Sequence, residues 1–270
     1  MLRKLIKHEF RATGRIMGPL YLVLLVTALG ANFSIRVMDR ADNRLLNILS
    51  GLVVMAFVAA IVGVCFMSFA LMLQRFYRNL LRDEGYIMFT LPASVHQQVW
   101  SKLIVSSVWF IATGAAVLLS FLVAAYEAGF VSAFFRGLAR VLQEMTAYYA
   151  LNGTAVALEL AALCFVSCVA FALQFYAAMA VGHSFSNHKM LLSVAFYFGF
   201  QFASQIIGTV LLVTLADSPL VELLATLDFH FTAVTAVHVT ICIILAITAV
   251  YGAIFYFLTT YFLKTRLNLE

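Results

Sequence analysis

Cysteine and histidine are the residues with the most obvious capacity for chemistry, but their spacing indicates packing and solvation. Cys164 and Cys168 lie four residues apart, on one face of a predicted helix, and no histidine or carboxylate lies with them on that face. A structural zinc site takes four ligands, so two thiols alone favour helix packing over metal binding. His183, His188 and Lys189 share a short polar stretch between two apolar runs, where contact with solvent explains them better than catalysis.

The sequence contains none of the short motifs that carry hydrolytic or redox chemistry. An ATP-hydrolysing chain needs a glycine-rich loop ending in Gly-Lys-Ser/Thr, whose backbone amides bind phosphates, and no Gly-Lys dipeptide occurs. The patterns HExxH, GxSxG and CxxC are also absent from the sequence. We therefore expect no catalytic residue, metal or cofactor in this chain, although an intramembrane enzyme built from sequence-distant residues stays open as an alternative.

Three glutamines inside long apolar runs are the remaining candidates for a functional role. Gln174 lies deep in one run, and Gln201 and Gln205 lie four residues apart in the next. Ser204 and Gly208 add small residues at the spacing that lets membrane helices approach closely. Helix packing through amide hydrogen bonds is the favoured interpretation, and contact with a transported substrate is the alternative. A proton-coupled carrier is disfavoured, because the middle of the runs carries no carboxylate.

The elements that hold these residues are membrane helices. The chain has 270 residues, of which 64% are hydrophobic and 11% charged, whereas about a quarter are charged in a soluble domain. A bilayer core needs about 20 apolar residues per helix, and six runs have that length. They are Ile16 to Ile35, Ile48 to Leu73, Leu103 to Tyr126, Leu160 to Val181, Met190 to Ala216 and Val239 to Leu263. None alternates as a barrel strand does, so we predict an all-α integral membrane protein with a single transmembrane domain, 1–270.

The first fifteen residues have a pattern of their own. Apolar residues such as Leu2, Ile6 and Phe10 fall near one helical face, and basic residues recur every four positions on another. This pattern predicts an amphipathic helix over 1–15 that lies at the interface, with a generic basic flank as the alternative. The run from Ile16 is long enough to span, so we expect it to be retained as a first helix and not cleaved as a signal peptide.

Basic residues predict the orientation of the chain. Twelve Lys and Arg fall in the segments that share a side with the N-terminus: Arg3, Lys4, Lys7, Arg11, Arg15, Arg75, Arg78, Arg82, Lys102, Lys189, Lys264 and Arg266. Five fall on the opposite side: Arg36, Arg40, Arg44, Arg136 and Arg140. By the positive-inside rule, both termini are cytoplasmic. The net charge of +5 follows from this topology, and we expect no nucleic-acid partner.

The predicted cytoplasmic loop 74–102 contains RNLLRDEGYIMFTLPAS, from Arg78 to Ser94. The second span continues its helical pattern past Arg75 into the cytosol, until Gly85 interrupts it. Pro92 ends the apolar stretch that follows, and Ser94 with Gln97 has the spacing of a helix-capping box. About two helical turns fit between glycine and proline. We therefore predict a short cytoplasmic helix from Tyr86 to Leu91.

Two segments on the opposite side are too apolar for free loops. Residues 127–153 contain Phe and Leu at helical spacing with Arg136 and Arg140, which predicts an amphipathic helix resting on the outer interface. Residues 217–235 have no Lys or Arg and are too short for two full spans. We predict an outer re-entrant helical hairpin there, of the kind that protein shields from lipid.

The loop residues carry a resemblance to a known family. Arg82-Asp83-Glu84-Gly85, then Leu91-Pro92-Ala93-Ser94, then Lys102 eight residues later resemble the signature of permease subunits of ATP-binding-cassette transporters of the type-2 exporter family. The whole-chain plan of an interfacial helix, six spans, two inner termini and a hairpin before the last span is similar to theirs. Asp83-Glu84 departs from the commoner Glu-Lys, which puts in doubt which ATPase such a loop would recognise.

The resemblance implies that Tyr86 to Leu91 is a coupling helix received by a separate ATPase subunit. The implied coupling residues are Arg82, Asp83, Glu84, Gly85, Tyr86, Ile87, Met88, Phe89, Leu91 and Pro92. It also implies ATP and Mg bound on that partner, a second permease copy or a homologous permease as dimer partner, surrounding membrane lipids, and export across a bacterial plasma membrane. Gln174, Gln201 and Gln205 are then the candidate residues lining the pathway.

Two alternatives stay open for the loop and the chain. The side chains of Tyr86, Met88 and Phe89 could instead fold back onto the bilayer or onto the protein's own helices. A membrane scaffold or sensor subunit that works without an ATPase would also present an apolar cytoplasmic segment to a signalling partner. The sequence names no substrate, since a peptide, lipid, glycan or drug would each suit an apolar cleft.

Overall fold

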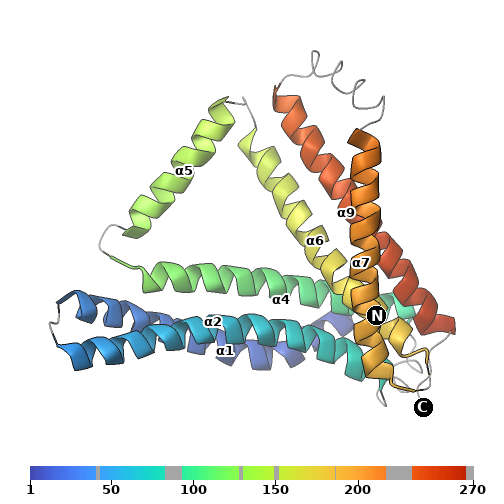
Figure 1. Ribbon diagram of the computed structural model, residues 1–270, viewed down its shortest axis with the longest axis horizontal. Helices are drawn as coiled ribbons and strands as arrows, with labels where there is room; N and C mark the ends of the chain where they lie inside the picture. The colour runs from blue at the N-terminus through green and yellow to red at the C-terminus, as the bar shows by residue number, and fades with distance from the viewer. Residues whose placement is uncertain are drawn as a thin grey trace. The chain divides into compact units, whose positions relative to one another are not determined.

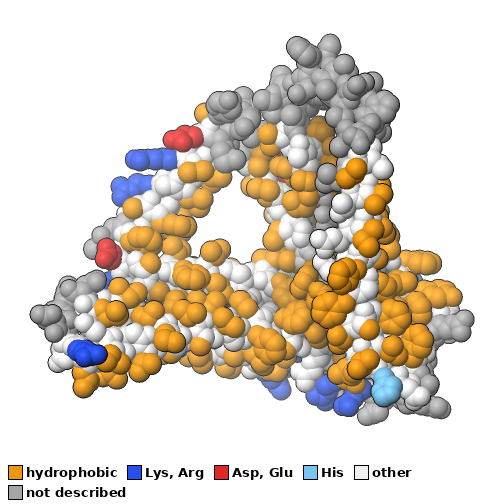
Figure 2. Space-filling model, in the orientation of Figure 1, with side chains coloured by type: hydrophobic (Ala, Val, Ile, Leu, Met, Phe, Trp, Pro, Cys, Tyr) orange, Lys and Arg blue, Asp and Glu red, His pale blue; other side chains and the backbone are white. Residues whose placement is uncertain are grey.

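The computed structural model describes residues 1–40, 43–82, 93–127, 130–148, 152–185, 187–216 and 233–265, and over these ranges the chain forms helices and short connections without a strand (Figure 1). Six helices are long and apolar enough to cross a membrane. They are Leu2–Met38, Arg44–Leu81, Val95–Ala124, Gly153–Gly182, Lys189–Leu211 and Val237–Thr265. The predicted all-α class is confirmed for the described residues, and each predicted span corresponds to one of these six helices. Hydrophobic side chains are widespread on the visible surface (Figure 2).

The chain divides into two compact units. Unit 1 comprises Met1–Arg75 and Trp100–Arg140, and unit 2 comprises Phe76–Val99 and Val141–Glu270. Unit 1 contains α1 (Leu2–Arg40), α2 (Arg44–Phe76) except its last residue, most of α4 (Val95–Ala124) and the first part of α5 (Phe130–Tyr148). Unit 2 contains the π-helical turn η1 (Tyr77–Leu81), the start of α4, and α6 (Gly153–Gly182), α7 (Lys189–Ala216) and α9 (Ala233–Thr265).

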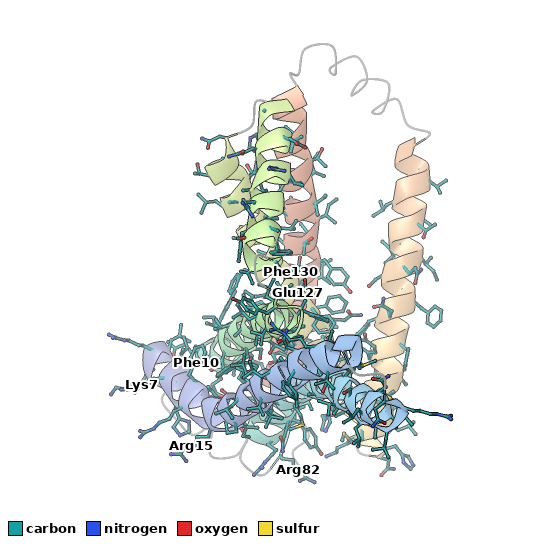
Figure 3. All side chains as sticks on the ribbon, turned by 90° about the vertical axis from the view of Figure 1, so that its left-hand side faces the viewer. Lys7, Phe10, Arg15, Arg82, Glu127 and Phe130 are labelled. Atoms are coloured by element: carbon teal, nitrogen blue, oxygen red, sulfur yellow. The ribbon has the colours of Figure 1, made fainter. Side chains whose placement is uncertain are left out.

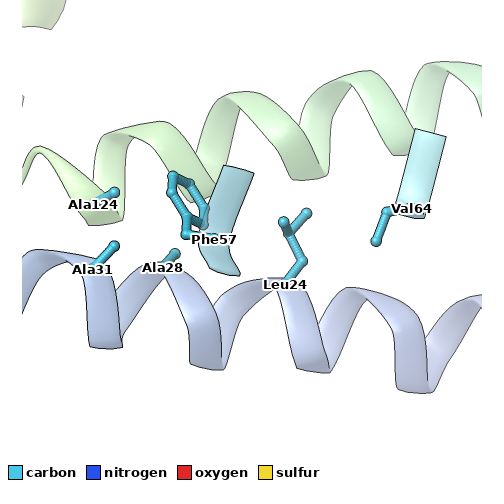
Figure 4. Close-up of a cluster of buried hydrophobic side chains, with 6 residues drawn as sticks. All are labelled: Leu24, Ala28, Ala31, Phe57, Val64 and Ala124. Atoms are coloured by element: carbon cyan, nitrogen blue, oxygen red, sulfur yellow. The ribbon is translucent and has the colours of Figure 1, made fainter. Parts of the chain in front are cut away.

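The core of unit 1 is formed by small and medium side chains of three helices. Leu24, Ala28 and Ala31 of α1 are buried against α2 and α4 (Figure 4). Phe57 of α2 is buried in the same cluster and meets Phe121 of α4 edge-on, with ring centroids 5.9 Å apart. In a bilayer, lipid tails are as apolar as the helices, so close contact at small residues supplies the stabilisation that burial from water supplies in soluble proteins.

Helix α1 differs from the prediction at its start. The separate interfacial helix 1–15 and the first span are one helix from Leu2 to Arg40, which passes through Pro19 without a break. Lys7 and Arg15 project outwards as an interfacial helix would have them (Figure 3). Glu9 and Thr13, however, are buried by protein. The sequence pattern predicted the exposed basic face of the helix. It did not predict that the face with Glu9 and Thr13 packs against other parts of the chain.

The second span continues beyond Arg75, as predicted. Its α-helical hydrogen bonding gives way to the π-helical turn η1, which ends where Arg82 adopts an extended backbone (φ −114°, ψ −168°). Residues 83–92 lie outside the described residues, so the predicted breaker Gly85 and the predicted helix Tyr86 to Leu91 stay predictions. Helix α4 then begins at Val95.

In unit 2, α6 packs against both α7 and α9. Gly182 ends α6 where α7 passes, and a Cβ atom there would lie 2.5 Å from the backbone nitrogen of Ser193. Gly252 of α9 lets Ala170 of α6 approach, with 3.5 Å between a Cβ at residue 252 and the Cβ of Ala170. Glycine therefore sets the close helix contacts of this unit.

The two segments predicted on the opposite side have different outcomes. The predicted helix within 127–153 is present as α5, from Phe130 to Tyr148. Its placement at a membrane interface stays a prediction. Of the predicted re-entrant segment 217–235, residues 217–232 lie outside the described residues.

Candidate functional site

The candidate site is the pair of helix ends in unit 2 that bracket residues 83–92. On the upstream side, the ring of Phe76 is fully buried and stacks on Tyr176 of α6, with centroids 3.9 Å apart and planes 9° apart. Leu80 and Leu81 of η1 are buried as well. Large apolar side chains at this spacing continue the inner face of the helix beyond the length that a bilayer needs. The upstream end is therefore anchored by packing.

Aromatic and charged groups complete this upstream anchor. The ring of Tyr77 meets His183 edge-on with centroids 5.3 Å apart, and the guanidinium of Arg82 lies 5.4 Å from the centroid of Tyr77. That distance is within the range of cation–π attraction. Arg82 is thus the last described residue before the candidate coupling segment, and its side chain lies beside the structured end of η1 (Figure 3).

His183 closes α6 as a neutral ring. Burial lowers its pKa below 6.5, and nearby Lys189 lowers it further, against the opposing effect of the hydrogen bond to Met179. A carbonyl can only accept, so Nδ1–H donates to the Met179 oxygen at 2.8 Å. The histidine therefore caps a helix end and packs against Tyr77. It is buried by protein, so the predicted contact with solvent is wrong for His183.

The downstream anchor is the start of α4. The Ser94 hydroxyl oxygen accepts from the Gln97 backbone N–H at 3.3 Å, which confirms the predicted cap. Two hydrogen bonds then tie His96 to α9: 2.6 Å from Nδ1 to the Tyr256 hydroxyl and 2.9 Å from Nε2 to Lys264 Nζ. An ammonium only donates, so Nε2 accepts from Lys264 and Nδ1 carries the proton given to Tyr256.

Both ends of segment 83–92 are fixed within unit 2, one on α6 and the other on α9. Among the described residues, no group of three or more His, Cys, Asp or Glu could hold a metal ion. Of the ten predicted coupling residues, Arg82 is described, and Asp83 to Leu91 and Pro92 lie outside the described residues.

Comparisons with known proteins do not assign the chain to a family. No protein-family model, curated protein or solved structure matches it.

A buried ion pair in unit 1 was missed by the sequence analysis. Lys102 Nζ lies 2.8 Å from Glu9 Oε1, and the two side chains are 3% and 5% exposed. Next to them, Trp109 Nε1 donates to Thr13 Oγ1 at 2.7 Å, and a cavity of about 20 Å³ separates this group from Arg75. A cavity of that size holds about one water molecule. Glu9 is the sole acid among residues 1–38, and Lys102 the sole cation of α4, which is the sequence feature that could have paired them.

The structure brings two of the three candidate pathway glutamines together. Gln174 is buried in α6, and its amide nitrogen donates to Gln201 Oε1 of α7 at 2.8 Å. This bond is the helix packing that the sequence favoured. Gln205 is exposed one turn further along α7, and its side-chain amide makes no hydrogen bond to another residue that the structure describes.

Glu159 also has a partner that the sequence did not reveal. Both of its carboxylate oxygens lie close to His238 Nδ1 of α9, at 2.8 and 2.9 Å. The two side chains are each 25% exposed. This pair links α6 to α9 at the end opposite His183, since Glu159 lies near the start of α6. The four cysteines are free thiols.

Proposed function

We propose that this chain is the permease subunit of an ATP-driven exporter of the ATP-binding-cassette class. In this proposal it forms the translocation pathway as a dimer, while separate ATPase subunits bind ATP and Mg. The observation that carries the proposal is that segment 83–92, two acidic residues followed by an apolar stretch, lies between two anchored helix termini. A chain without a phosphate loop then has a means of using another chain's ATP.

The side chains of the segment suit a partner pocket. Tyr86, Met88 and Phe89 are of the types that dominate binding energy at protein interfaces, where aromatic anchors enter desolvated pockets. Asp83 and Glu84 beside them provide charges that set the register of docking. The proposed coupling helix is Tyr86 to Leu91.

The anchors provide a route for the movement. A push on segment 83–92 acts on η1, which packs on α6, and on the start of α4, which is bonded to α9. Farther along α4, the Lys102–Glu9 pair ties that helix to α1. Packed interiors are nearly incompressible, so a displacement at the loop moves whole helices. Motion of these helices would open the pathway.

The exposed amide of Gln205 supports a second copy or a homologous permease as partner. An unpaired amide is costly against lipid, and membrane helices bury such groups at their interfaces. On α7 it lies four residues from Gln201, so the same face already carries a second polar group.

Substitution within the segment tests the proposal. The tagged chain is purified from its native membrane, associated ATPases are identified by mass spectrometry, and ATP hydrolysis is measured. We expect Tyr86→Asp or Phe89→Asp to abolish co-purification and stimulation of a cassette ATPase, because a charge is costly in an apolar pocket. Thr90→Asp is the matched control within the segment. Unchanged co-purification of both variants would remove the coupling assignment, and absence of any cassette ATPase would favour the scaffold alternative.

A further inference from the structure

A wide apolar groove lies between α4 and the first turns of α5, within unit 1. Its volume is about 690 Å³, and every residue that lines it is Ala, Leu or Phe. Leu118 and Leu122 form part of its α4 wall, and Phe130, Phe134 and Leu138 form part of its α5 wall. Pockets for small ligands typically measure about 300–1,000 Å³, so the groove has room for an extended hydrocarbon chain.

The groove is open. Leu118 is 65% exposed, and Phe134 and Phe135 are 43% and 52% exposed, so none of the described chain covers them. Because α4 is one of the six helices that can cross a membrane, hydrocarbon is the solvent on this surface. α4 ends at Ala124 and α5 follows within six residues, so we expect α5 to lie at the membrane interface, where the apolar layer gives way to headgroups.

The other face of α5 is cationic. The basic residues of α5 are Arg136 and Arg140, which lie one turn apart. Basic side chains lie along the side of α5 that faces away from α4 (Figure 2). The Arg136 guanidinium is held by Ser132, through bonds of 3.1 Å to its carbonyl and 3.2 Å to its hydroxyl. Arg140 is exposed. Guanidinium groups bind phosphate oxygens through paired, charge-assisted hydrogen bonds.

We propose that the α4/α5 groove is a site for an anionic phospholipid. The acyl chain fills the apolar groove under α5, and the headgroup lies over the opposite, basic face of the same helix, where its phosphate binds Arg136 and Arg140 at the boundary of the bilayer. α5 carries two arginines and a single acidic residue, Glu144, so its net charge is positive. This positive charge favours anionic over zwitterionic headgroups. The site does not depend on whether the chain is a transporter subunit.

Photochemical labelling in vesicles tests this site. The full chain is reconstituted in phosphatidylcholine vesicles that contain a trace of phosphatidylglycerol with a diazirine in its acyl chain, and the labelled peptides are mapped. We expect label on 115–125 and 130–138, with a much weaker label from the same diazirine on phosphatidylcholine. Each of Arg136→Gln and Arg140→Gln should lower the phosphatidylglycerol label by about fivefold. Each substitution removes the attraction between one basic residue and an anionic headgroup, which corresponds to about that change in affinity.

Two further variants separate headgroup from groove. Leu122→Trp fills the groove and should lower labelling by both lipids, whereas Leu158→Trp, at a residue 73% exposed on α6, should not. Arg44→Gln, at the exposed start of α2, is the control for charge loss. The proposal would be overturned if the two lipids labelled the chain equally and the label were unchanged in Arg136→Gln and Arg140→Gln. Cross-links from the groove to a second copy, instead of to lipid, would overturn it as well.

Discussion

At the scale of single residues, the buried Glu9–Lys102 pair is the clearest case of one charge stabilising another. The pair lies 2.8 Å apart and is almost inaccessible. Removing one member of a buried pair takes away the opposite charge that faces the other, which typically costs about 3–5 kcal/mol. Replacing both members by apolar residues is much less costly, because neither charge then has to be desolvated.

Lys102→Met should therefore lower the unfolding temperature of the detergent-solubilised chain strongly, and Glu9→Met with Lys102→Met should recover most of the loss. Lys4→Met, at an exposed position of α1, the helix that carries Glu9, is the control and should have little effect. If the double variant were as unstable as the single one, the pair would not be the source of the stability.

His183 provides a pH prediction at the same scale. Burial lowers its pKa in the folded chain, so the unfolded chain takes up a proton first as the pH falls. Unfolding is then favoured progressively below the ordinary pKa of 6.5, and the contribution of neutral His183 is present above that pH. The groups facing it are Tyr77, Ser193 and Lys189.

We expect the unfolding temperature to fall between pH 7 and pH 5, and His183→Asn to flatten this fall. His188→Asn, at an exposed neighbouring position, should keep the wild-type profile. Equal slopes in the wild type and His183→Asn would contradict the assignment.

At the scale of elements, Gly182 shows how one missing side chain allows two helices to meet. A Cβ atom at this residue would come within 2.5 Å of the Ser193 backbone, and backbone cannot turn aside as a flexible side chain can. Gly182→Ala should therefore destabilise the contact between α6 and α7, by more than a typical surface change of about 0.5 kcal/mol. Gly199→Ala on α7 meets nothing within 4 Å and should be neutral or stabilising. The measurement is the unfolding temperature of each variant. Equal changes in Gly182→Ala and Gly199→Ala would contradict the conclusion that Gly182 allows the close approach of α6 and α7.

How far the elements could be predicted depends on the length of their pattern. The six long apolar helices could be predicted because the thickness of a bilayer sets the length of an apolar run that crosses it. The cap at Ser94 could be predicted because its side chain bonds to a residue three positions along the same helix. The continuity of α1 could not be predicted, because burial of Glu9 and Thr13 depends on Lys102 and Trp109, about ninety residues away. The same holds for His96 with Tyr256 and for Glu159 with His238: each partner lies on a helix distant in sequence.

In the whole molecule, we propose that a chain without an ATPase motif works with a partner that supplies one. The described residues include six helices long enough to cross a membrane, and the two anchored helix ends lie on either side of the proposed coupling segment. The proposed partner contact is centred on the aromatic residues of segment 83–92, whose alternative is to fold back onto the bilayer or the chain itself.

Site-specific photo-crosslinking from residue 89 tests this claim most directly. A benzophenone amino acid replaces Phe89 in the full chain, in its native membrane, and Phe198, an exposed aromatic of α7, is replaced as the control. The account predicts that residue 89 cross-links to a cassette ATPase and that residue 198 does not. Cross-links from residue 89 confined to lipid or to the chain's own helices would contradict it.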